Sequence, residues 1–473
     1  MSLAPSPGWR ASLTLLAIAV AALPIWYWDA GLIEKESTHF VRQYLDGRSL
    51  PQKVFDPHAN DIGTYQAREL SYFIDYVDAT VLAALLDRGA VLLLPLSAVV
   101  AAALTVVSFS TLAPRAFPLI PPLTAVLALL LYFTNHIYSV TTAVFYRSAK
   151  PLLTPLILTA LLFFAYVLRQ SGAQGQRGQR ARAGLFLATF ALGCAMSLLD
   201  RQGFFYTVAM TAALAIWHRA RGNARECVWG GVAAVVAMVL YNVVVGPWLI
   251  AAINGYRPSF EYQRVDVLHL VGHPLHFIQS IRLISQSAQI MLGSFPLWLY
   301  AGIAAVAIGS TWRRTGKPPV LVWRPGQATA GARVVMFVAA SQVLMFALMI
   351  VRHPPIWDNP DHQLWYYPLP FQALVVFGVL LAVERLIQRR SGPRLAAVNL
   401  VFVAMIAGNL LSWPGHRRVM LSSPWFPEIH AQSTLLKQAL QQRSPVPGLT
   451  PDYQLFYDFW KKEKAPGSVP RVP

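Results

Sequence analysis

Residues 151–168 read PLLTPLILTALLFFAYVL, residues 183–199 read AGLFLATFALGCAMSLL, and the segment 171–182 between them reads SGAQGQRGQRAR. A helix needs roughly 20 apolar residues to cross the hydrocarbon core of a bilayer, so each apolar run predicts a membrane span. The segment between the two runs is rich in Gly, Gln and Arg, which is typical of a flexible basic loop. Long apolar runs joined by short polar connections recur along the chain, and this pattern decides the fold class.

We predict an all-α polytopic membrane protein with about 11 transmembrane helices, within a range of roughly 10 to 13. The predicted spans are 11–28, 89–111, 117–134, 151–168, 183–199, 203–218, 229–251, 290–310, 333–351, 369–384 and 395–412. The first of them ends in aromatic residues and is not followed by a small-residue cleavage site, so it is interpreted as a retained helix and not as a signal peptide.

The charges follow the alternation of the connections. With the N-terminus in the cytoplasm, the inner connections carry 18 Lys and Arg against two acids, Glu226 and Glu384. The positive-inside rule accounts for this asymmetry, and for much of the net charge of +18, without a nucleic-acid partner. Abundant Ala, Arg and Leu and short loops favour a bacterial inner (plasma) membrane. We expect residues 1–412 to form the bundle, including an outer loop at 29–88, and residues 413–473 to form a C-terminal tail on the outer face.

The outer loop 29–88 holds 10 of the 21 acids of the chain and many aromatic residues. Its apolar periodicity predicts one helix over 33–44 and a second over 64–86. The second helix has a polar stripe formed by Arg68, Ser71, Asp75 and Asp78. Two interpretations stay open: an interfacial helix with a solvated charged face, or a stripe that faces a ligand or a metal ion.

Other outer connections place polar residues at the ends of spans, where a charge is costly and therefore often functional. The neighbours Asp200 and Arg201 have a structural alternative, because they could pair with each other. Three histidines, His269, His273 and His276, have a spacing that fits one helical face. They form only a weak zinc candidate, because no acid or Cys constellation accompanies them.

Two stretches of the outer loop carry a resemblance to a known family. Residues 34–40 read EKESTHF and run on to Tyr44-Leu45-Asp46-Gly47, and residues 65–78 follow with a second acidic and aromatic stretch. With many spans, an inner N-terminus and a long first outer loop, the chain resembles the GT-C superfamily of membrane glycosyltransferases. Members often have Asp-Glu or Asp-Asp where this chain has Glu-Lys-Glu, so Glu36 and Glu34 are alternatives for the catalytic acid.

The resemblance implies transfer of a sugar from a polyprenyl-phosphate donor to a glycan, lipid or protein acceptor at the periplasmic face. Glu36 is the first candidate for the general base and Glu34 the second, and a single base implies inversion at the anomeric carbon. Cations at outer span ends suit the donor phosphate. The substrate-binding candidates are Arg147, Lys150, Asp200, Arg201, Arg352 and His353. Asp75 and Asp78 are candidates to hold Mg²⁺ or Mn²⁺ on the leaving phosphate, with neutralisation by Arg and Lys and no metal as the alternative.

Two other classes of function remain as alternatives. The first is a different lipid-linked glycan enzyme, such as an O-antigen ligase or polymerase, for which the Arg and His residues of the connection 252–289 are the supporting feature. The second is a transporter or flippase, but such proteins place binding groups near the bilayer midplane, whereas here the acids gather in one outer loop.

Overall fold

The fold is described from a computed structural model of the chain. The described residues are 7–27, 32–33, 47–55, 67–88, 95–145, 149–169, 179–221, 224–258, 341, 369–388, 392–422 and 425–463. Apart from one pair of two-residue strands, the described elements are helices, which confirms the predicted all-helical class. The predicted spans 290–310 and 333–351 lie outside the described residues.

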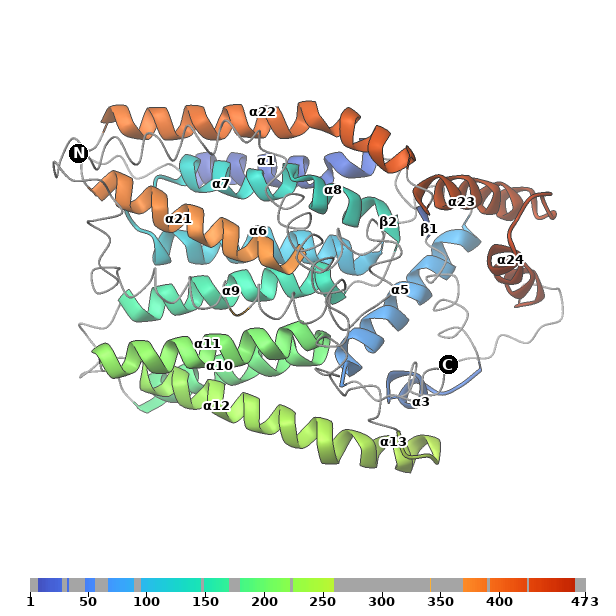
Figure 1. The fold of residues 1–473 in the computed structure, drawn as a ribbon, viewed down its shortest axis with the longest axis horizontal. Helices are drawn as coiled ribbons and strands as arrows, with labels where there is room; N and C mark the ends of the chain where they lie inside the picture. The colour runs from blue at the N-terminus through green and yellow to red at the C-terminus, as the bar shows by residue number, and fades with distance from the viewer. Residues whose placement is uncertain are drawn as a thin grey trace, which may run out of the picture.

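Most helices lie side by side in one elongated bundle (Figure 1). The helices of the bundle are α1 (Pro7–Tyr27), α6 (Leu96–Ala116), α7 (Pro122–Thr134), α8 (His136–Ala143), α9 (Ala149–Arg169), α10 (Gln179–Leu199), α11 (Arg201–Arg221), α12 (Arg225–Leu240), the π-helix η2 (Tyr241–Val245), α13 (Gly246–Asn254), the 3₁₀ turn η5 (Leu369–Phe371), α21 (Gln372–Gln388) and α22 (Gly392–Ser422).

Five stretches of the described helices are long and apolar enough to cross a membrane: Leu96–Ala116, Ala149–Arg169, Gln179–Leu199, Arg225–Asn254 and Leu395–Gly415. Shorter apolar helical stretches cover Ala11–Pro24, Pro122–Thr134 and Leu369–Glu384. All of these overlap predicted spans, and α11 overlaps the predicted span 203–218 as a helix that is not among the five. Multi-pass membrane character is therefore supported, while the total of about 11 spans stays a prediction.

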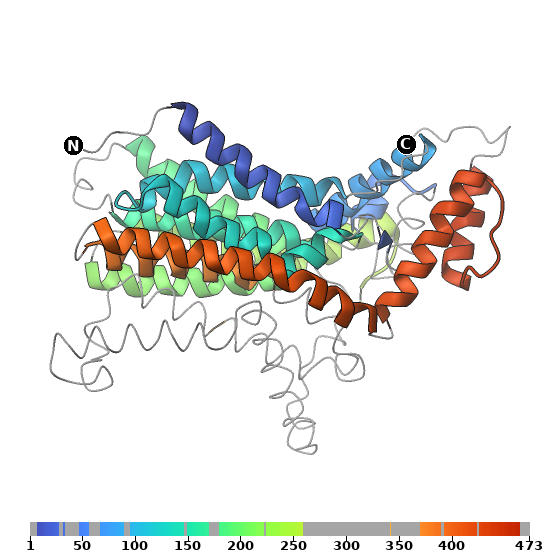
Figure 2. The same cartoon turned by 90° about the horizontal axis from the view of Figure 1, so that it is seen from above.

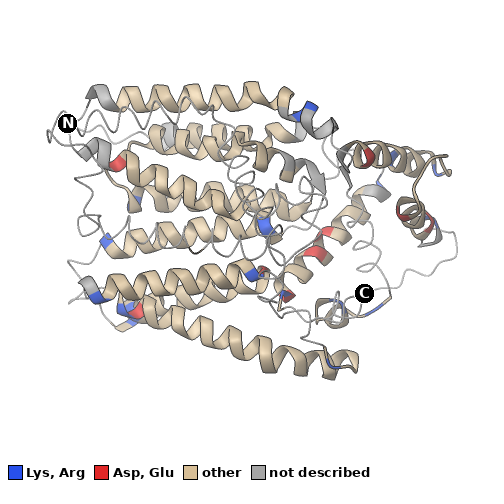
Figure 3. Ribbon diagram, in the orientation of Figure 1, with Lys and Arg blue, Asp and Glu red and all other residues tan. Residues whose placement is uncertain are grey.

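The helices run back and forth between two ends of the bundle, and their charged residues lie toward those ends (Figure 3). The end to which α6 and α9 run carries Arg115 and Arg169, as the predicted inner surface should. There the Arg169 guanidinium donates to both carboxylate oxygens of Glu384 and lies over the Phe117 ring, with 5.1 Å between Cζ and the ring centroid. This pair joins α9 to α21. The side of the membrane that each end faces stays a prediction.

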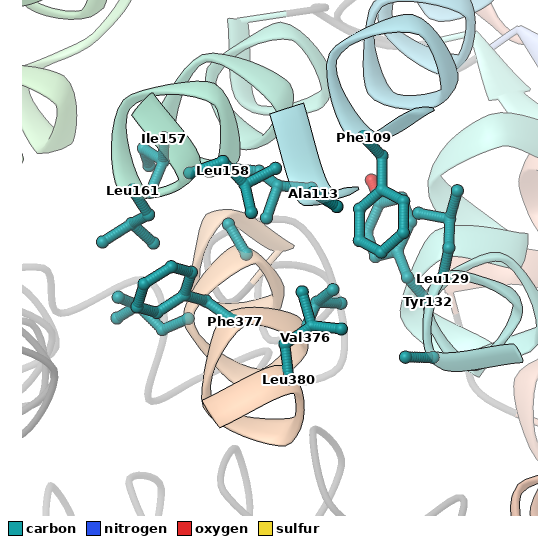
Figure 4. Packing of buried hydrophobic residues seen from close by; sticks show 14 of the residues in the cluster. Phe109, Ala113, Leu129, Tyr132, Ile157, Leu158, Leu161, Val376, Phe377 and Leu380 are labelled. Carbon is teal, nitrogen blue, oxygen red and sulfur yellow. The ribbon is translucent and has the colours of Figure 1, made fainter. Parts of the chain in front are cut away.

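The centre of the bundle is packed by large apolar side chains from four helices (Figure 4). Val376, Phe377 and Leu380 of α21 lie against α6, α7 and α9, and Phe377 meets Phe117 edge to face at 5.5 Å between centroids. The side chains of Phe133, Leu153 and Ile157 have no exposed surface. Burial of this kind fixes the four helices relative to one another, because a close-packed interior tolerates little change in volume.

A second group of elements lies at the end of the bundle opposite Arg115 and Arg169. We call it the loop-one end, after the first outer loop, residues 29–88. It contains α3 (Leu50–Phe55), α5 (Glu69–Asp87) and the parallel strand pair β1 (Leu32–Ile33) and β2 (Val144–Phe145), with Leu32 opposite Val144 and Ile33 opposite Phe145. The helix α5 agrees with the predicted second helix of the loop but begins five residues later than residue 64. The predicted helix over 33–44 lies mostly outside the described residues.

The C-terminal segment forms a helical hairpin at the same end, beyond the bundle in both views (Figure 1, Figure 2). Its helices are α23 (Trp425–Gln442) and α24 (Pro451–Glu463). Tyr453, Phe456 and Tyr457 of α24 pack in one cluster with Ala79 and Leu82 of α5. The tail is thus attached to the loop-one helix, although its location outside the membrane stays a prediction.

One side chain fixes the turn of this hairpin. The Gln432 amide nitrogen donates to the carbonyl of Gly448 at 2.9 Å, and the Gln432 amide oxygen accepts from the N–H of Thr450 at 2.8 Å. Gly448 has φ +97°, a left-handed conformation that glycine adopts without a steric penalty.

The helices α10, α11 and α12 approach so closely that glycine is required at their contacts. A Cβ at Gly193 would lie 2.8 Å from the Cβ of Ala234 and 2.9 Å from the Cγ2 of Thr207. A Cβ at Gly203 would overlap the backbone carbonyl of Met196, which cannot move aside as a flexible side chain can. Small residues of this kind let helix backbones pack closely inside membranes.

We expect Gly203→Ala to destabilise the protein by about 3 kcal/mol, because the added methyl group must push α10 and α11 apart. The measurement is the thermal unfolding midpoint of the full chain purified in detergent. Gly184→Ala is the matched control, since a Cβ at Gly184 meets nothing within 4 Å. Equal midpoints for the two variants would contradict the close approach at Gly203.

Candidate functional site: a buried ion cluster at the loop-one end

The helix α5 crosses the loop-one end of the bundle. Its first backbone bond runs from the N–H of Tyr72 to the carbonyl of Arg68 at 3.0 Å, so Arg68 is its N-cap residue. The N–H of Ala67 donates to the Asn242 amide oxygen in η2 at 3.3 Å. These contacts fix where the helix begins and bring Arg68 to the ends of α10 and α11.

The polar stripe of α5 faces inward. Ser71, Asp75 and Asp78 are buried, whereas the apolar residues Ile74 and Val77 of the same helix are only partly buried. The interpretation of the polar stripe as a solvated face is therefore wrong. The Asp78 carboxylate bonds to Ser97 of the bundle instead of to water.

Asp200 is the centre of the site. It lies in the turn between α10 and α11, its exposed fraction is 3%, and it forms ion pairs with the Lys150 ammonium and the Arg68 guanidinium. Its Oδ1 also accepts from the N–H of Gln202 at 2.8 Å, which satisfies a donor in the first turn of α11. One carboxylate thereby joins α5, α9 and the α10–α11 turn.

The cations of the cluster differ in exposure. Lys150 has an exposed fraction of 1%, whereas the Arg68 side chain has 17%. Arg68 is therefore the cation of the cluster that lies closer to the surface. A guanidinium in this position can contact an anion that arrives from the surface, because electrostatic attraction is strong where water is excluded.

Burial alone would raise the pKa of the Asp200 carboxyl. The Lys150 ammonium and the Arg68 guanidinium together lower this pKa by more than burial raises it, so the pKa lies well below its usual range. A depressed carboxyl pKa contributes stability that is fully present above the pKa of the unfolded chain and is lost as the pH falls through the folded value. The Asp200 carboxylate therefore keeps its charge throughout the neutral range.

Asp78 has a different role. Its Oδ1 accepts from the backbone N–H of Ser97 at 2.9 Å, and its Oδ2 accepts from the Ser97 hydroxyl. The N-cap residue of α6, Pro95, provides no side-chain cap. Asp78 thus caps α6 from the neighbouring helix and ties α5 to the bundle a second time.

The structure brings together two of the predicted substrate-binding residues, Lys150 and Asp200, which form an ion pair. Arg201 is the next residue in the sequence and begins α11. The ion pairs described for Asp200 are with Lys150 and Arg68, so the Asp200–Arg201 pairing is not what the structure describes. Five candidates lie outside the described residues: Glu34, Glu36, Arg147, Arg352 and His353.

The predicted metal ligands Asp75 and Asp78 are both buried on α5. Within the described part of the chain, no group of three or more His, Cys, Asp or Glu side chains is placed to hold a metal ion. The Asp78 oxygens are already bonded to Ser97, which gives this residue a structural task. His269, His273 and His276 lie outside the described residues.

Sequence reasoning missed the partners that complete the site. Arg68 was placed on the stripe, but its ion pair with Asp200, 132 residues further on, has no local signal. Asn242 and Ser97 were not candidates. Two features of the sequence indicated this site: the polar stripe on the loop helix and the charged residues at the ends of predicted spans.

Comparisons of the chain with protein-family models, with curated proteins and with solved structures found no match.

We expect Asp200→Asn to destabilise the protein by about 3–5 kcal/mol, because it leaves Lys150 and Arg68 without their buried counter-charge. The thermal midpoint in detergent measures this loss. Adding Lys150→Met to the same chain should restore part of it, since one buried charge is then removed.

Glu226→Gln is the control for this series. Glu226 pairs with Arg182 at 3.9 Å in a more exposed setting, where an ion pair contributes about 0–1 kcal/mol. If Asp200→Asn is as stable as Glu226→Gln, the Asp200 cluster does not hold the loop-one helix.

Proposed function

We propose that the protein is a GT-C-type membrane glycosyltransferase of the bacterial inner membrane. In this proposal it moves a sugar from a polyprenyl-phosphate donor to a glycan, lipid or protein acceptor of the cell envelope. The loop-one end faces the periplasm and the N-terminus lies in the cytoplasm. The observation that carries the proposal is the buried cluster of Arg68, Lys150 and Asp200, which places two cations at the first outer loop.

The depth of the cluster along the bundle supports a lipid-linked substrate. Trp229 and Trp248 are exposed by 57% and 65%, and about 28 Å of helix separates them at 1.5 Å per residue. The large apolar side chains exposed between them are Val236, Val239, Leu240, Val243, Val244 and Val245. An apolar face bounded by Trp at this spacing fits the hydrocarbon core, which is about 30 Å thick.

The ion cluster lies near one edge of this apolar face. Asn242, which accepts from the N–H of Ala67, lies about 9 Å along the helix before Trp248. Arg68 is therefore close to the level at which the phosphate of a prenyl-anchored donor would meet the protein. Charged groups at this depth are costly and are most often retained for function.

In the proposed reaction, Glu36 accepts the proton of the acceptor hydroxyl, with Glu34 as the second candidate, and both belong to the same outer loop as α5. The acceptor oxygen forms its bond to the anomeric carbon while the bond from that carbon to the phosphate oxygen breaks. The polyprenyl phosphate leaves with the bonding electrons, and Arg68, Lys150 and Arg201 are the cations that offset its charge. Direct attack by the acceptor inverts the anomeric centre.

The described helices give less support to a transporter. Their charged residues lie toward the ends of the bundle (Figure 3), whereas transporters place binding groups near the midplane. The ligase or polymerase alternative rests on the connection 252–289, most of which lies outside the described residues.

The first prediction concerns the reaction itself. The purified full chain should transfer labelled sugar from at least one member of a panel of polyprenyl-phosphate sugars to a cell-envelope extract. Glu36→Gln should abolish transfer and keep donor binding, because it removes the base without removing a cation. Glu34→Gln is the matched control and should retain transfer. If no donor supports transfer by the folded wild-type protein, the proposal is wrong; if only Glu34→Gln is inactive, the base is Glu34.

The second prediction concerns the metal. Because both Asp78 oxygens bind Ser97, we expect Arg and Lys to neutralise the leaving phosphate, and transfer should continue in excess chelator. The measurement is the initial rate with and without chelator. A rate that is lost in chelator and regained with Mg²⁺ or Mn²⁺ would return Asp75 and Asp78 to the role of metal ligands.

A further inference from the structure

The first turn of α5 contains a buried hydroxyl group that makes no hydrogen bond to any described residue. The exposed fraction of Ser71 is 1%, and its Oγ has no hydrogen-bond partner in the part of the chain that the structure describes. A buried polar group left in this state costs about 1–3 kcal/mol. Such a group in a native protein calls for an explanation.

The position of Ser71 explains why the usual partner is missing. Buried hydroxyl groups elsewhere in the bundle donate to the carbonyl four residues earlier, as Thr105 does to Ala101 at 2.7 Å and Thr134 does to Leu130 at 2.8 Å. The residue four before Ser71 is Ala67, which precedes the helix. The first turn has no helical carbonyl behind it, so this hydroxyl is left for another partner.

The surroundings of Ser71 favour an anionic partner. Ser71 lies three residues after Arg68, on the same face of α5, and Arg68 leads directly to Asp200 and Lys150. The N–H groups of Leu70 and Ser71 have no acceptor within the helix, and the helix N-terminus carries partial positive charge. Glu69 and Asp75 are the nearby acids on α5, and with Asp200 they balance the charges of Arg68, Lys150 and Arg201.

We propose that Ser71 Oγ, the N–H groups of Leu70 and Ser71 and the Arg68 guanidinium form a binding site for phosphoryl oxygens. The hydroxyl and the N–H groups donate to the oxygens, and the guanidinium supplies the charge. This inference deepens the proposed function, since it assigns the donor phosphate to the start of α5. The same chemistry would hold a free phosphate, so the experiment separates the two sources.

The test compares wild type with Ser71→Ala, using the full chain purified in detergent. The probes are a polyprenyl monophosphate, the corresponding polyprenol without phosphate, and inorganic phosphate. Removing the hydroxyl should leave the thermal midpoint of the protein without probe unchanged or higher, because an unsatisfied group is lost. The affinity for the polyprenyl monophosphate should fall about tenfold, which is the effect of about 1.4 kcal/mol. The weaker affinity for the polyprenol should not change.

Thr105→Val is the matched control, because it removes a buried hydroxyl that has a partner. It should lower the midpoint and leave the affinity for the phosphate probe unchanged. An unchanged affinity for polyprenyl monophosphate in Ser71→Ala would overturn the inference, and so would a lower midpoint without probe, since the hydroxyl would then have a structural partner.

Inorganic phosphate identifies the source. If the affinity for inorganic phosphate also falls about tenfold in Ser71→Ala, the site recognises the phosphoryl group alone. If only the polyprenyl monophosphate binds, and its affinity falls in the variant, the prenyl chain is needed to bring the phosphate to the site. Both results support the site.

The inference and the proposed function can fail separately. A wild-type protein that transfers sugar while Ser71→Ala binds normally would overturn only the inference. A protein that transfers no sugar but loses phosphate affinity in Ser71→Ala would overturn only the function.

Discussion

The Asp200 carboxylate is the interaction on which the loop-one end depends. Lys150 and Arg68 come from α9 and from the start of α5, and both place positive charge where little water remains. Desolvation makes each charge unfavourable alone, and the two pairs are acceptable only because one carboxylate meets both cations and also accepts from the N–H of Gln202. The position of α5 relative to the bundle is therefore set by charge pairing as well as by apolar contact.

Two further contacts hold α5 along its length. Asp78 caps the start of α6 through Ser97, and Ala79 and Leu82 pack against the aromatic residues of α24. From its beginning to its end, α5 is thus held by the ion pair of Arg68, then by the hydrogen bonds of Asp78, and then by the apolar packing of Ala79 and Leu82. An amphipathic helix on a membrane surface would have only the last of these. This attachment gives polar groups near Arg68 the fixed positions that binding requires.

The spans and α5 were accessible from the sequence because apolar length and helical periodicity are local properties. The direction in which the polar stripe faces could not be predicted. Polar residues of a helix usually face water, and the buried partners of this stripe lie far along the chain. Ser97 is 19 residues from Asp78, and Asp200 is 132 residues from Arg68. The candidates Lys150, Asp200 and Arg201 were found because charges at span ends are costly, but periodicity does not reveal which charges meet.

The strength of this pairing also limits which groups can respond to pH. The pKa of Asp200 is held well below its usual range by Lys150 and Arg68, in spite of its burial, so the carboxylate stays ionised at any pH near neutrality. Arginine stays protonated over the same range. The positive charge of Arg68 is then constant over this range. In the proposed transfer reaction, a pH dependence between about 5 and 8 would come from a group other than Asp200 and Arg68. The acids of the first outer loop are the candidates, because a general base works best with a pKa near the operating pH.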